Sequence, residues 1–308
     1  MSWRPPTLDP FRHLALVYSS DHEYAGGTLP FIQAGLATGE VVMVAIERSR
    51  IDQLRDELGA EAALVRWVDI RRVGANPARI IPLWRQFVAA HADRPVRGIG
   101  EPVWPGQTPE HRVEAQRHEV LLNLAFSASP GFSLMCPYDA RRLDPEVIEE
   151  AQHSHPQVRH DGRERPGQGS LAVEGALETS LRPAPSGAAE VAFDEPSPVL
   201  LRRLVDAPIR EAGLTARRAD DLALALTAAA TSLARLGGRL LARCWREQDA
   251  VLAEILSPRR IEDPLLGREW PPTDQGRGLW AANQLSDLSE LRTSAAGTVV
   301  RLRVLAGS

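Results

Sequence analysis

Short apolar runs alternate with amphipathic segments through the first half of the chain, and this order constrains the fold more than any other feature. Residues 41–46 form a continuous apolar run, which is the pattern of a strand covered on both faces. Residues 78–92 instead carry apolar side chains at spacings of three and four, which is typical of a helix with one buried face. A repeated strand–helix order predicts an α/β domain with a doubly wound, mostly parallel sheet.

The same patterns predict the other elements of this half. The expected strands are residues 14–19, 41–46, 64–68, 96–100 and 132–136. The expected helices are residues 24–38, interrupted near Pro30, then 50–58, 78–92 and 110–126, and a last helix from Pro145 to about residue 153 with Asp144 as its N-cap.

Residues 161–187 lose both periodicities and are rich in Gly, Pro, Ser and charge, so they predict a flexible linker. The linker separates a domain of residues 10–160 from a second domain of residues 188–306. The second domain is expected to contain strands 189–193, 240–246, 251–256, 288–293 and 298–304, and helices 198–212, 216–236 and 278–285. Helices grouped apart from antiparallel strands predict an α+β two-layer sandwich.

Composition limits the classes of partner. The 36 basic and 40 acidic residues give a net charge of −4, which argues against a dedicated nucleic-acid binder. No apolar run approaches the ~20 residues that span a bilayer, and the N-terminus lacks an apolar signal core. The two cysteines, Cys136 and Cys244, are too few for a disulfide framework, so a cytoplasmic location is expected. Every basic residue is Arg, which excludes a Walker lysine or a lysine base.

Polar residues follow the ends of the expected strands in the first domain. In doubly wound sheets, ligands bind beyond the carboxyl ends of the strands, near the switch in strand order. We therefore expect a pocket for a small molecule at this edge, with one further side chain from the preceding helix. Its predicted residues are Ser20, Asp21, Glu47, Glu101, His118, Cys136, Tyr138 and Asp139.

A metal site is an alternative interpretation of part of this set. His118, Glu119, Cys136 and Asp139 are suitable ligand types, but no Cys-x-x-Cys or His-x-x-x-His spacing accompanies them, so no metal is predicted. Adjacent His118 and Glu119 are expected to face different sides of their helix. Cys136 is then a small apolar residue that ends a core strand, or a nucleophile paired with His118. His155, near the linker, is expected at the surface.

Ordered motifs in residues 11–156 resemble the methanogen/methylotroph sensory domain, abbreviated MEDS. The motifs are Phe31-Ile32-Gln33-Ala34-Gly35-Leu36 with Gly39-Glu40, Asn76-Pro77-Ala78-Arg79, Gly100-Glu101-Pro102-Val103-Trp104, His118-Glu119-Val120-Leu121-Leu122-Asn123, Cys136-Pro137-Tyr138-Asp139 and His155-Pro156. The resemblance implies a sensor of a small molecule on a fold related to RecA-like ATPase cores. No Gly-x-x-x-x-Gly-Lys loop is present, so ATP hydrolysis in this half is not expected.

Ordered motifs in residues 198–305 resemble the anti-sigma-factor serine kinases of the histidine-kinase-like ATPase fold. They are Arg218-Ala219-Asp220-Asp221-Leu222, Ile261-Glu262-Asp263-Pro264-Leu265-Leu266-Gly267, Gly276-Arg277-Gly278-Leu279-Trp280 and Asn283-Gln284-Leu285-Ser286-Asp287-Leu288. The resemblance implies a remnant of a nucleotide site, made by Ser232, Asp274, Gly276, Arg277 and Gly278.

Two motifs that hold ATP in that family are altered. The catalytic Glu and the Mg²⁺-binding Asn of the family correspond here to Ala228 and Ser232; alanine has no acid–base chemistry, and serine is a poorer ligand for a hard cation. The adenine-binding Asp-x-Gly corresponds to Ser257-Pro258-Arg259, where a long cation replaces the glycine that lets the backbone approach a base. The remnant residues are therefore interpreted as parts of a turn and helix start that the fold still needs, and weak nucleotide binding in an altered pose is the alternative.

These patterns lead to the hypothesis of a cytoplasmic, two-domain transcription regulator of the anti-sigma-factor type. Its first domain senses a small ligand, and its second, a pseudokinase without catalytic residues or cofactor, binds a sigma factor or an anti-sigma antagonist. The alternative is an active serine kinase that uses ATP and Mg²⁺ to phosphorylate an antagonist. A third interpretation makes the first domain an enzyme that acts through Cys136 or Glu101. Direct nucleic-acid and membrane partners are not expected, and the sequence leaves open whether the chain forms a homodimer.

Overall fold

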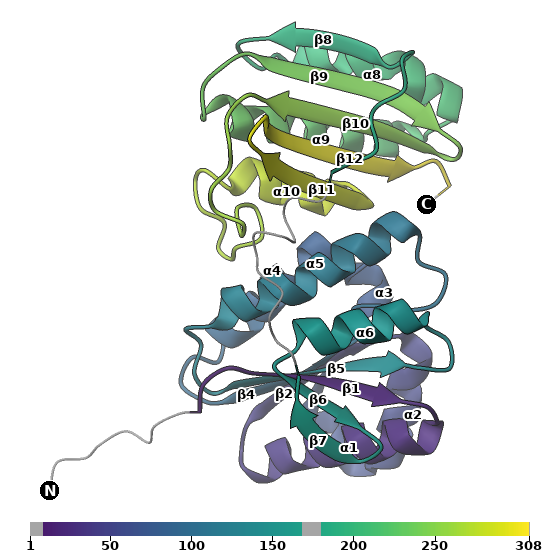
Figure 1. The fold of residues 1–308 in the computed structure, drawn as a ribbon, viewed down its shortest axis with the longest axis vertical. Helices are drawn as coiled ribbons and strands as arrows, with labels where there is room; N and C mark the ends of the chain where they lie inside the picture. Colours follow the sequence, from purple (N-terminus) through teal and green to yellow (C-terminus); the bar gives the residue numbers. More distant parts are fainter. Residues whose placement is uncertain (1–8, 168–179, 308) are drawn as a thin grey trace, which may run out of the picture. The chain divides into compact units, whose positions relative to one another are not determined.

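The computed structural model describes residues 9–167 and 180–307, which divide into two compact units (Figure 1). The N-terminal unit comprises Met1–Gly74 and Trp84–Ala172, and the C-terminal unit comprises Ala75–Leu83 and Val173–Ser308. Each unit is built around its own β-sheet.

The N-terminal unit contains a seven-stranded sheet with the order β3-β2-β4-β5-β1-β6-β7. All pairs are parallel except that of β6 with β7, which is antiparallel. The strands are β1 (Arg12–Tyr18), β2 (Val41–Ile46), β3 (Val65–Asp69), β4 (Val96–Gly100), β5 (Phe132–Asp139), β6 (Gln157–His160) and β7 (Arg163–Pro166). The predicted mixed α/β fold with a mostly parallel sheet is confirmed.

Helices cover both faces of this sheet (Figure 1). Helices α1 and α2 lie on one face, and α4, α5 and α6 lie on the other. Their bounds are α1 (Asp21–Ala37), α2 (Arg48–Leu58), α3 (Ile70–Val73), α4 (Ile80–Ala89), α5 (Pro109–Phe126) and α6 (Pro145–Ser154), with the short 3-10 turn η1 (Gly59–Leu64). The 3-10 turn η2 (Pro77–Arg79) and the start of α4 fall in the C-terminal unit. Because both faces are covered, β2 is buried along Val42–Ile46, as its apolar sequence requires.

Several details of this unit differ from the sequence expectations, and three of them have a clear physical cause. Helix α1 runs unbroken through Pro30, since the burial of Tyr24, Phe31 and Ile32 outweighs the backbone hydrogen bond that proline removes. Strand β5 continues past Cys136 to Asp139 because it pairs with β1 along that whole length.

The third difference lies in the predicted linker. Strand β7 occupies residues expected to be irregular, and it forms a hairpin with β6, which is likewise absent from the predicted strands. Asp161 and Gly162 connect the two strands with φ values of 51° and 70°, which is the backbone of a tight hairpin turn. An Asp-Gly pair is a hairpin signal that the sequence already contained.

The C-terminal unit contains a five-stranded sheet with the order β11-β12-β10-β9-β8, in which every pair is antiparallel. The elements are β8 (Ala189–Phe193), α8 (Pro198–Ala212), α9 (Ala216–Ala234), β9 (Leu240–Glu247), β10 (Ala250–Ser257), α10 (Arg277–Leu285), β11 (Leu288–Ser294) and β12 (Gly297–Leu305). Helices α8 and α9 pack on the sheet, and alternate residues of its strands enter their shared core. The predicted separate antiparallel sheet is confirmed.

Across the described parts of both units, every helix is too short or too polar to cross a bilayer.

Candidate functional site

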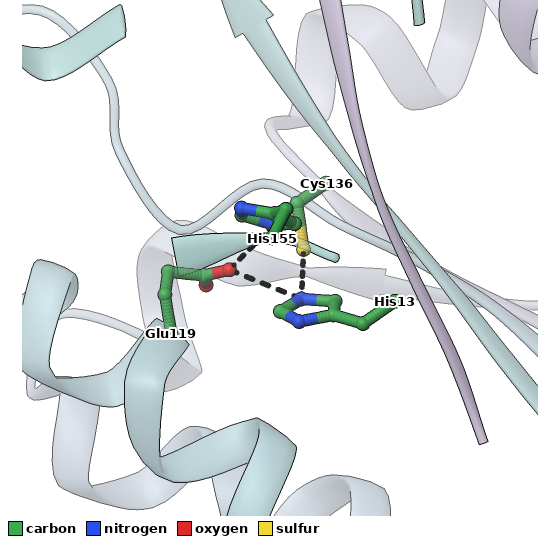
Figure 2. Close-up of side chains that lie close together, drawn as sticks. All are labelled: His13, Glu119, Cys136 and His155. Carbon is green, nitrogen blue, oxygen red and sulfur yellow. Dashed lines mark hydrogen bonds and ion pairs between the residues drawn. The ribbon is translucent and has the colours of Figure 1, made fainter. Parts of the chain in front are cut away.

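Four buried side chains from different segments of the N-terminal unit converge on one point (Figure 2). His13 comes from β1, Cys136 from β5, Glu119 from α5, and His155 directly follows α6. We call these four residues the buried cluster. Each residue offers one possible ligand atom, and these four atoms all lie within 4.8 Å of one another.

The contacts inside the buried cluster centre on Glu119 and His13. The Glu119 Oε2 atom lies 3.2 Å from His13 Nε2 and 2.9 Å from His155 Nε2. His13 Nε2 also lies 3.4 Å from the Cys136 Sγ atom. The two histidine rings are 4.0 Å apart between centroids. Two imidazoles, a thiol and a carboxylate therefore share one small buried volume.

Neighbouring groups determine which nitrogen of each histidine carries a proton. The Asn123 amide nitrogen donates to the Ser154 carbonyl at 2.7 Å, so its Oδ1 faces His13 Nδ1, 2.9 Å away, as an acceptor. His13 Nδ1 must then carry the hydrogen. His155 Nδ1 lies 2.8 Å from the Ala151 carbonyl, which can only accept, so it also carries the hydrogen. In their neutral forms, both rings turn a bare Nε2 lone pair toward Glu119.

Burial dominates the electrostatics of the cluster. It raises the pKa of Cys136 well above the usual thiol value, and the charge of Glu119 adds to this shift. It lowers the pKa of His155, and a charged His13 would lower that pKa further. Burial alone would raise the pKa of Glu119, but hydrogen bonds and positive charge from His13 and His155 in their protonated forms outweigh it and hold the pKa well below its usual value. Burial thus keeps the proton on Cys136 and opposes a positive charge on His155.

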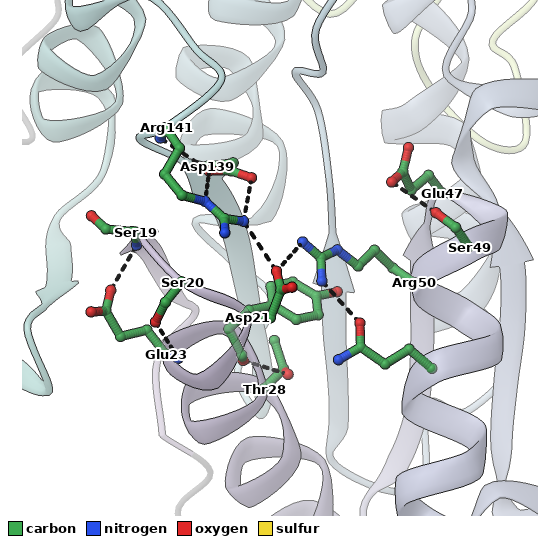
Figure 3. A network of polar contacts seen from close by, with 12 residues as sticks. Ser19, Ser20, Asp21, Glu23, Thr28, Glu47, Ser49, Arg50, Asp139 and Arg141 are labelled. Carbon is green, nitrogen blue, oxygen red and sulfur yellow. Dashed lines mark hydrogen bonds and ion pairs between the residues drawn. The ribbon is translucent and has the colours of Figure 1, made fainter.

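A second polar group lies at the carboxyl edge of the sheet, where β1 and β5 end side by side (Figure 3). Asp21 Oδ1 accepts hydrogen bonds from Arg50 at 3.0 Å and from Arg141 at 3.1 Å. Arg141 also pairs with Asp139 at 3.0 Å. Helices α1 and α6, which follow the two strands, lie on opposite faces of the sheet. The network therefore occupies a switch point, the place where such sheets bind ligands.

Two carboxyl groups extend this edge across β2 and β4. The Glu47 backbone N–H donates to Glu101 Oε2 at 3.1 Å, and Arg71 pairs with the Glu47 carboxylate. Burial, reinforced by the charge of Glu47, raises the pKa of Glu101 to about 7. Burial opposes ionisation of Glu47 as well, but hydrogen bonds from Ser49 and Arg71 keep its pKa below the usual value. Neighbouring environments thus push the two pKa values apart, which is a common arrangement at functional sites.

Comparison with known families bears on the unit that contains both groups. Residues 12–156 match the MEDS family, described as the MEthanogen/methylotroph, DcmR Sensory domain. The match supports a sensory domain in this half and a signalling or regulatory role for the protein. No curated protein matches the chain.

Within the MEDS domain, the structure brings part of the predicted pocket together. Asp21, Glu47, Glu101 and Asp139 lie at the carboxyl edge as described above. Ser20 lies there too, and its Oγ accepts a hydrogen bond from the Glu23 N–H to cap α1.

The other predicted pocket residues lie elsewhere. Cys136 is inside β5 rather than at its end, because the strand is longer than expected, and it joins the buried cluster. The Tyr138 ring packs edge-on against His155, with centroids 5.7 Å apart. His118 is buried, and its Nε2 lies 3.8 Å from Glu119 Oε1, so the two adjacent residues do not face opposite environments.

Sequence reasoning missed His13 and misplaced His155. The expectation of a surface position for His155 is wrong, because its side chain is fully buried. His13 places a polar residue at a core position of the otherwise apolar strand β1. A polar residue in such a run could have indicated a buried polar site.

The residues predicted to form a nucleotide-site remnant gather where α10 begins, and they bond mainly to one another and to their neighbours. Ser232 Oγ donates to the Gln275 carbonyl at 3.1 Å, and Arg277 pairs with Asp274 at 2.8 Å. The Gly276 N–H donates to Thr273 Oγ1 at 3.1 Å.

Gly278 shows how closely α10 packs on α9. A Cβ atom at this position would lie 2.2 Å from the Ala228 carbonyl oxygen and 2.5 Å from Ser232 Oγ. The glycine therefore meets a helix backbone where the family resemblance implied a phosphate.

Proposed function

We propose that the protein is a signalling regulator of the anti-sigma-factor type. Its RecA-like MEDS domain senses a small ligand at the carboxyl edge of the sheet. Its C-terminal unit, with a histidine-kinase-like ATPase fold, binds a sigma factor or an anti-sigma antagonist without nucleotide. The observation that carries this proposal is the MEDS match over a sheet whose switch point gathers an arginine–carboxylate network.

That network favours a ligand with a carboxylate or similar anionic group. Arg50 and Arg141 converge on a single oxygen of Asp21, whose side chain is largely exposed. A small anion can replace the Asp21 carboxylate on the two guanidinium groups, since arginine recognises planar anions through paired hydrogen bonds. Such a ligand regulates the protein only if it binds one conformational state more tightly than another.

The contacts at the start of α10 support a protein-binding role for the second unit. Ser232, in the position of the Mg²⁺ ligand, already donates to Gln275, and Gly278 lies against the backbone of α9. Neither residue is arranged to receive a phosphate. The antiparallel sheet with helices packed on it supports the proposed fold.

The sensory half is tested by thermal-shift measurements of the whole chain with a panel of small carboxylates. We expect at least one of them to raise the melting temperature, and Arg141→Gln to remove that increase. Arg142→Gln is the matched control, because Arg142 is the exposed neighbour and makes no contact with Asp21 in the network described above. Equal responses of both variants would contradict the proposed site.

The proposed role of the C-terminal unit is tested by calorimetry with Mg-ATP and by co-purification from the native host. We expect no nucleotide binding at micromolar concentrations, and a sigma factor or an antagonist protein bound to the chain. Micromolar Mg-ATP binding that is weakened by Asp274→Ala would favour the kinase alternative, since Asp274 is exposed and its replacement leaves the core intact.

A further inference from the structure

We propose that His13, Glu119, Cys136 and His155 bind one zinc-class divalent metal ion in a closed, four-ligand site inside the MEDS domain. This site is distinct from the arginine–carboxylate network at the carboxyl edge of the sheet. It uses residues that are separated by up to 142 positions in the sequence, and it does not depend on the proposed ligand or partner.

The buried cluster can present more hydrogen-bond acceptors than donors, and a bound cation would satisfy those acceptors. His13 and His155 each have their Nδ1 hydrogen engaged by an acceptor and point a bare Nε2 inward. Glu119, as a carboxylate, also offers only lone pairs. When both rings are neutral and Glu119 is ionised, three acceptors face one another, and the thiol of Cys136 can supply a single hydrogen. His155 Nε2 and both carboxylate oxygens of Glu119 are buried without a well-directed hydrogen bond, although they lie in ion-pair range.

The spacing of the ligand atoms suits a tetrahedral ion. Bonds of about 2.0–2.3 Å to zinc place neighbouring ligand atoms roughly 3.4 Å apart. The three contacts in the cluster are 2.9, 3.2 and 3.4 Å. The widest separation is at most 4.8 Å, so modest side-chain rotation completes the tetrahedron.

Outer hydrogen bonds already orient both histidines for metal binding. Asn123 holds His13 through Nδ1, and the Ala151 carbonyl holds His155 in the same way. Metal-binding histidines characteristically donate their second ring N–H to an amide oxygen or carboxylate, which fixes the ring and raises its basicity. Asn123 also donates to the Ser154 carbonyl, so it links α5 to the segment that presents His155.

The donor set selects the class of metal and balances its charge. Two imidazole nitrogens, one sulfur and one carboxylate suit zinc, whereas Mg²⁺ and Ca²⁺ require oxygen ligands. On binding, the Cys136 S–H bond breaks, a Zn–S bond forms, and the proton leaves to solvent. The thiolate and the Glu119 carboxylate then neutralise the divalent charge, which removes the cost of burying an isolated ion.

All four ligands are protein side chains and all are buried, which is the arrangement of a structural rather than a catalytic zinc site. The ion would join β1 and β5 to helix α5 and to the end of α6.

The test measures metal binding by the full-length chain. The purified protein is stripped with a chelator and titrated with Zn²⁺ against a competing indicator, and bound zinc is then measured by mass spectrometry. We expect about one zinc per chain. Cys136→Ser should lose this zinc, whereas Cys244→Ala, which removes the other buried thiol, should retain it.

Two further measurements keep the proposal falsifiable if Cys136→Ser folds poorly. Co²⁺ added to the stripped wild type should give the absorption bands of a tetrahedral thiolate complex. Asn123→Ala should weaken zinc binding about 10–100-fold through the loss of His13 orientation. The proposal is overturned if the folded wild type binds no more zinc than Cys136→Ser, or if cobalt gives no thiolate band. Imidazole NMR signals that show protonated His13 or His155 in metal-free and zinc-exposed protein alike would also overturn it.

Discussion

Replacing Gly278 with alanine separates two explanations for the glycine at the start of α10. If the residue served a bound phosphate, the substitution would impair nucleotide binding and leave the fold intact. The structure instead places Gly278 against the Ala228 carbonyl, so we expect Gly278→Ala to destabilise the C-terminal unit whether or not nucleotide is present.

The expected loss of stability follows from the distance by which α10 and α9 must separate. A Cβ atom 2.2 Å from the Ala228 oxygen has to move to about 3.4 Å, where ordinary contact begins, so α10 and α9 must separate by roughly 1.2 Å. Overpacking costs about 1–3 kcal/mol, and an overlap of this size with a helix backbone falls in the upper part of that range, about 2–3 kcal/mol. The better helix propensity of alanine returns at most ~1 kcal/mol. We therefore expect a net loss of about 1–2 kcal/mol, or roughly 3–8 °C in melting temperature.

The assay is equilibrium urea unfolding of the whole chain, followed by circular dichroism with and without Mg-ATP. Gly187→Ala is the control in the same unit, because a Cβ at this exposed turn meets no atom within 4 Å. It should change the free energy of unfolding by less than about 0.5 kcal/mol. If Gly278→Ala is as stable as the control but loses nucleotide binding, the packing explanation is wrong.

Three carboxyl groups give further predictions. Burial raises the pKa of Glu101 from 4.5 to about 7, so this carboxyl group binds its proton more tightly in the folded state. The free energy of unfolding of the wild type should therefore fall by up to about 3 kcal/mol between pH 4.5 and 7. The same measurement on Glu101→Gln should show no such fall. Glu40→Gln breaks the paired hydrogen bonds from Arg97 at 2.7 and 2.8 Å and should cost about 1–3 kcal/mol in urea unfolding, so an unchanged midpoint would refute the importance of this pair. Glu254→Ala leaves the buried Arg301 and the partly exposed Arg243 without their carboxylate. It should lower stability by about 3–5 kcal/mol, whereas a loss below 1 kcal/mol would mean that water compensates the charge.

Much of the local structure could be predicted because it depends on neighbouring residues. Helix α8 begins at Pro198 and strand β8 spans Ala189–Phe193, as the sequence indicates. A proline suits the first turn of a helix, and spacings of 3.6 or 2 residues record which face is buried. Where the predictions failed, longer-range contacts decided the outcome. Strand β5 extends to Asp139 because β1 pairs with it throughout, and no local pattern marks that partner.

The carboxyl-edge network and the buried cluster of the MEDS domain differ in the same way, since one depends on local sequence and the other on long-range contacts. The polar residues of the carboxyl edge could be predicted, because they follow strands whose ends meet in any parallel sheet. The buried cluster could not, since it joins His13, Glu119, Cys136 and His155 without any ligand spacing in the sequence.

The order of strands and helices, the apolar faces they bury and the polar ends of the parallel strands could be read from local sequence, because backbone geometry ties these features to adjacent residues. The position of β1 between β5 and β6, which brings His13 beside Cys136 and His155, became known from the folded chain alone. Strand order is selected by the packing of surfaces far apart in the chain, and that choice has no local signature.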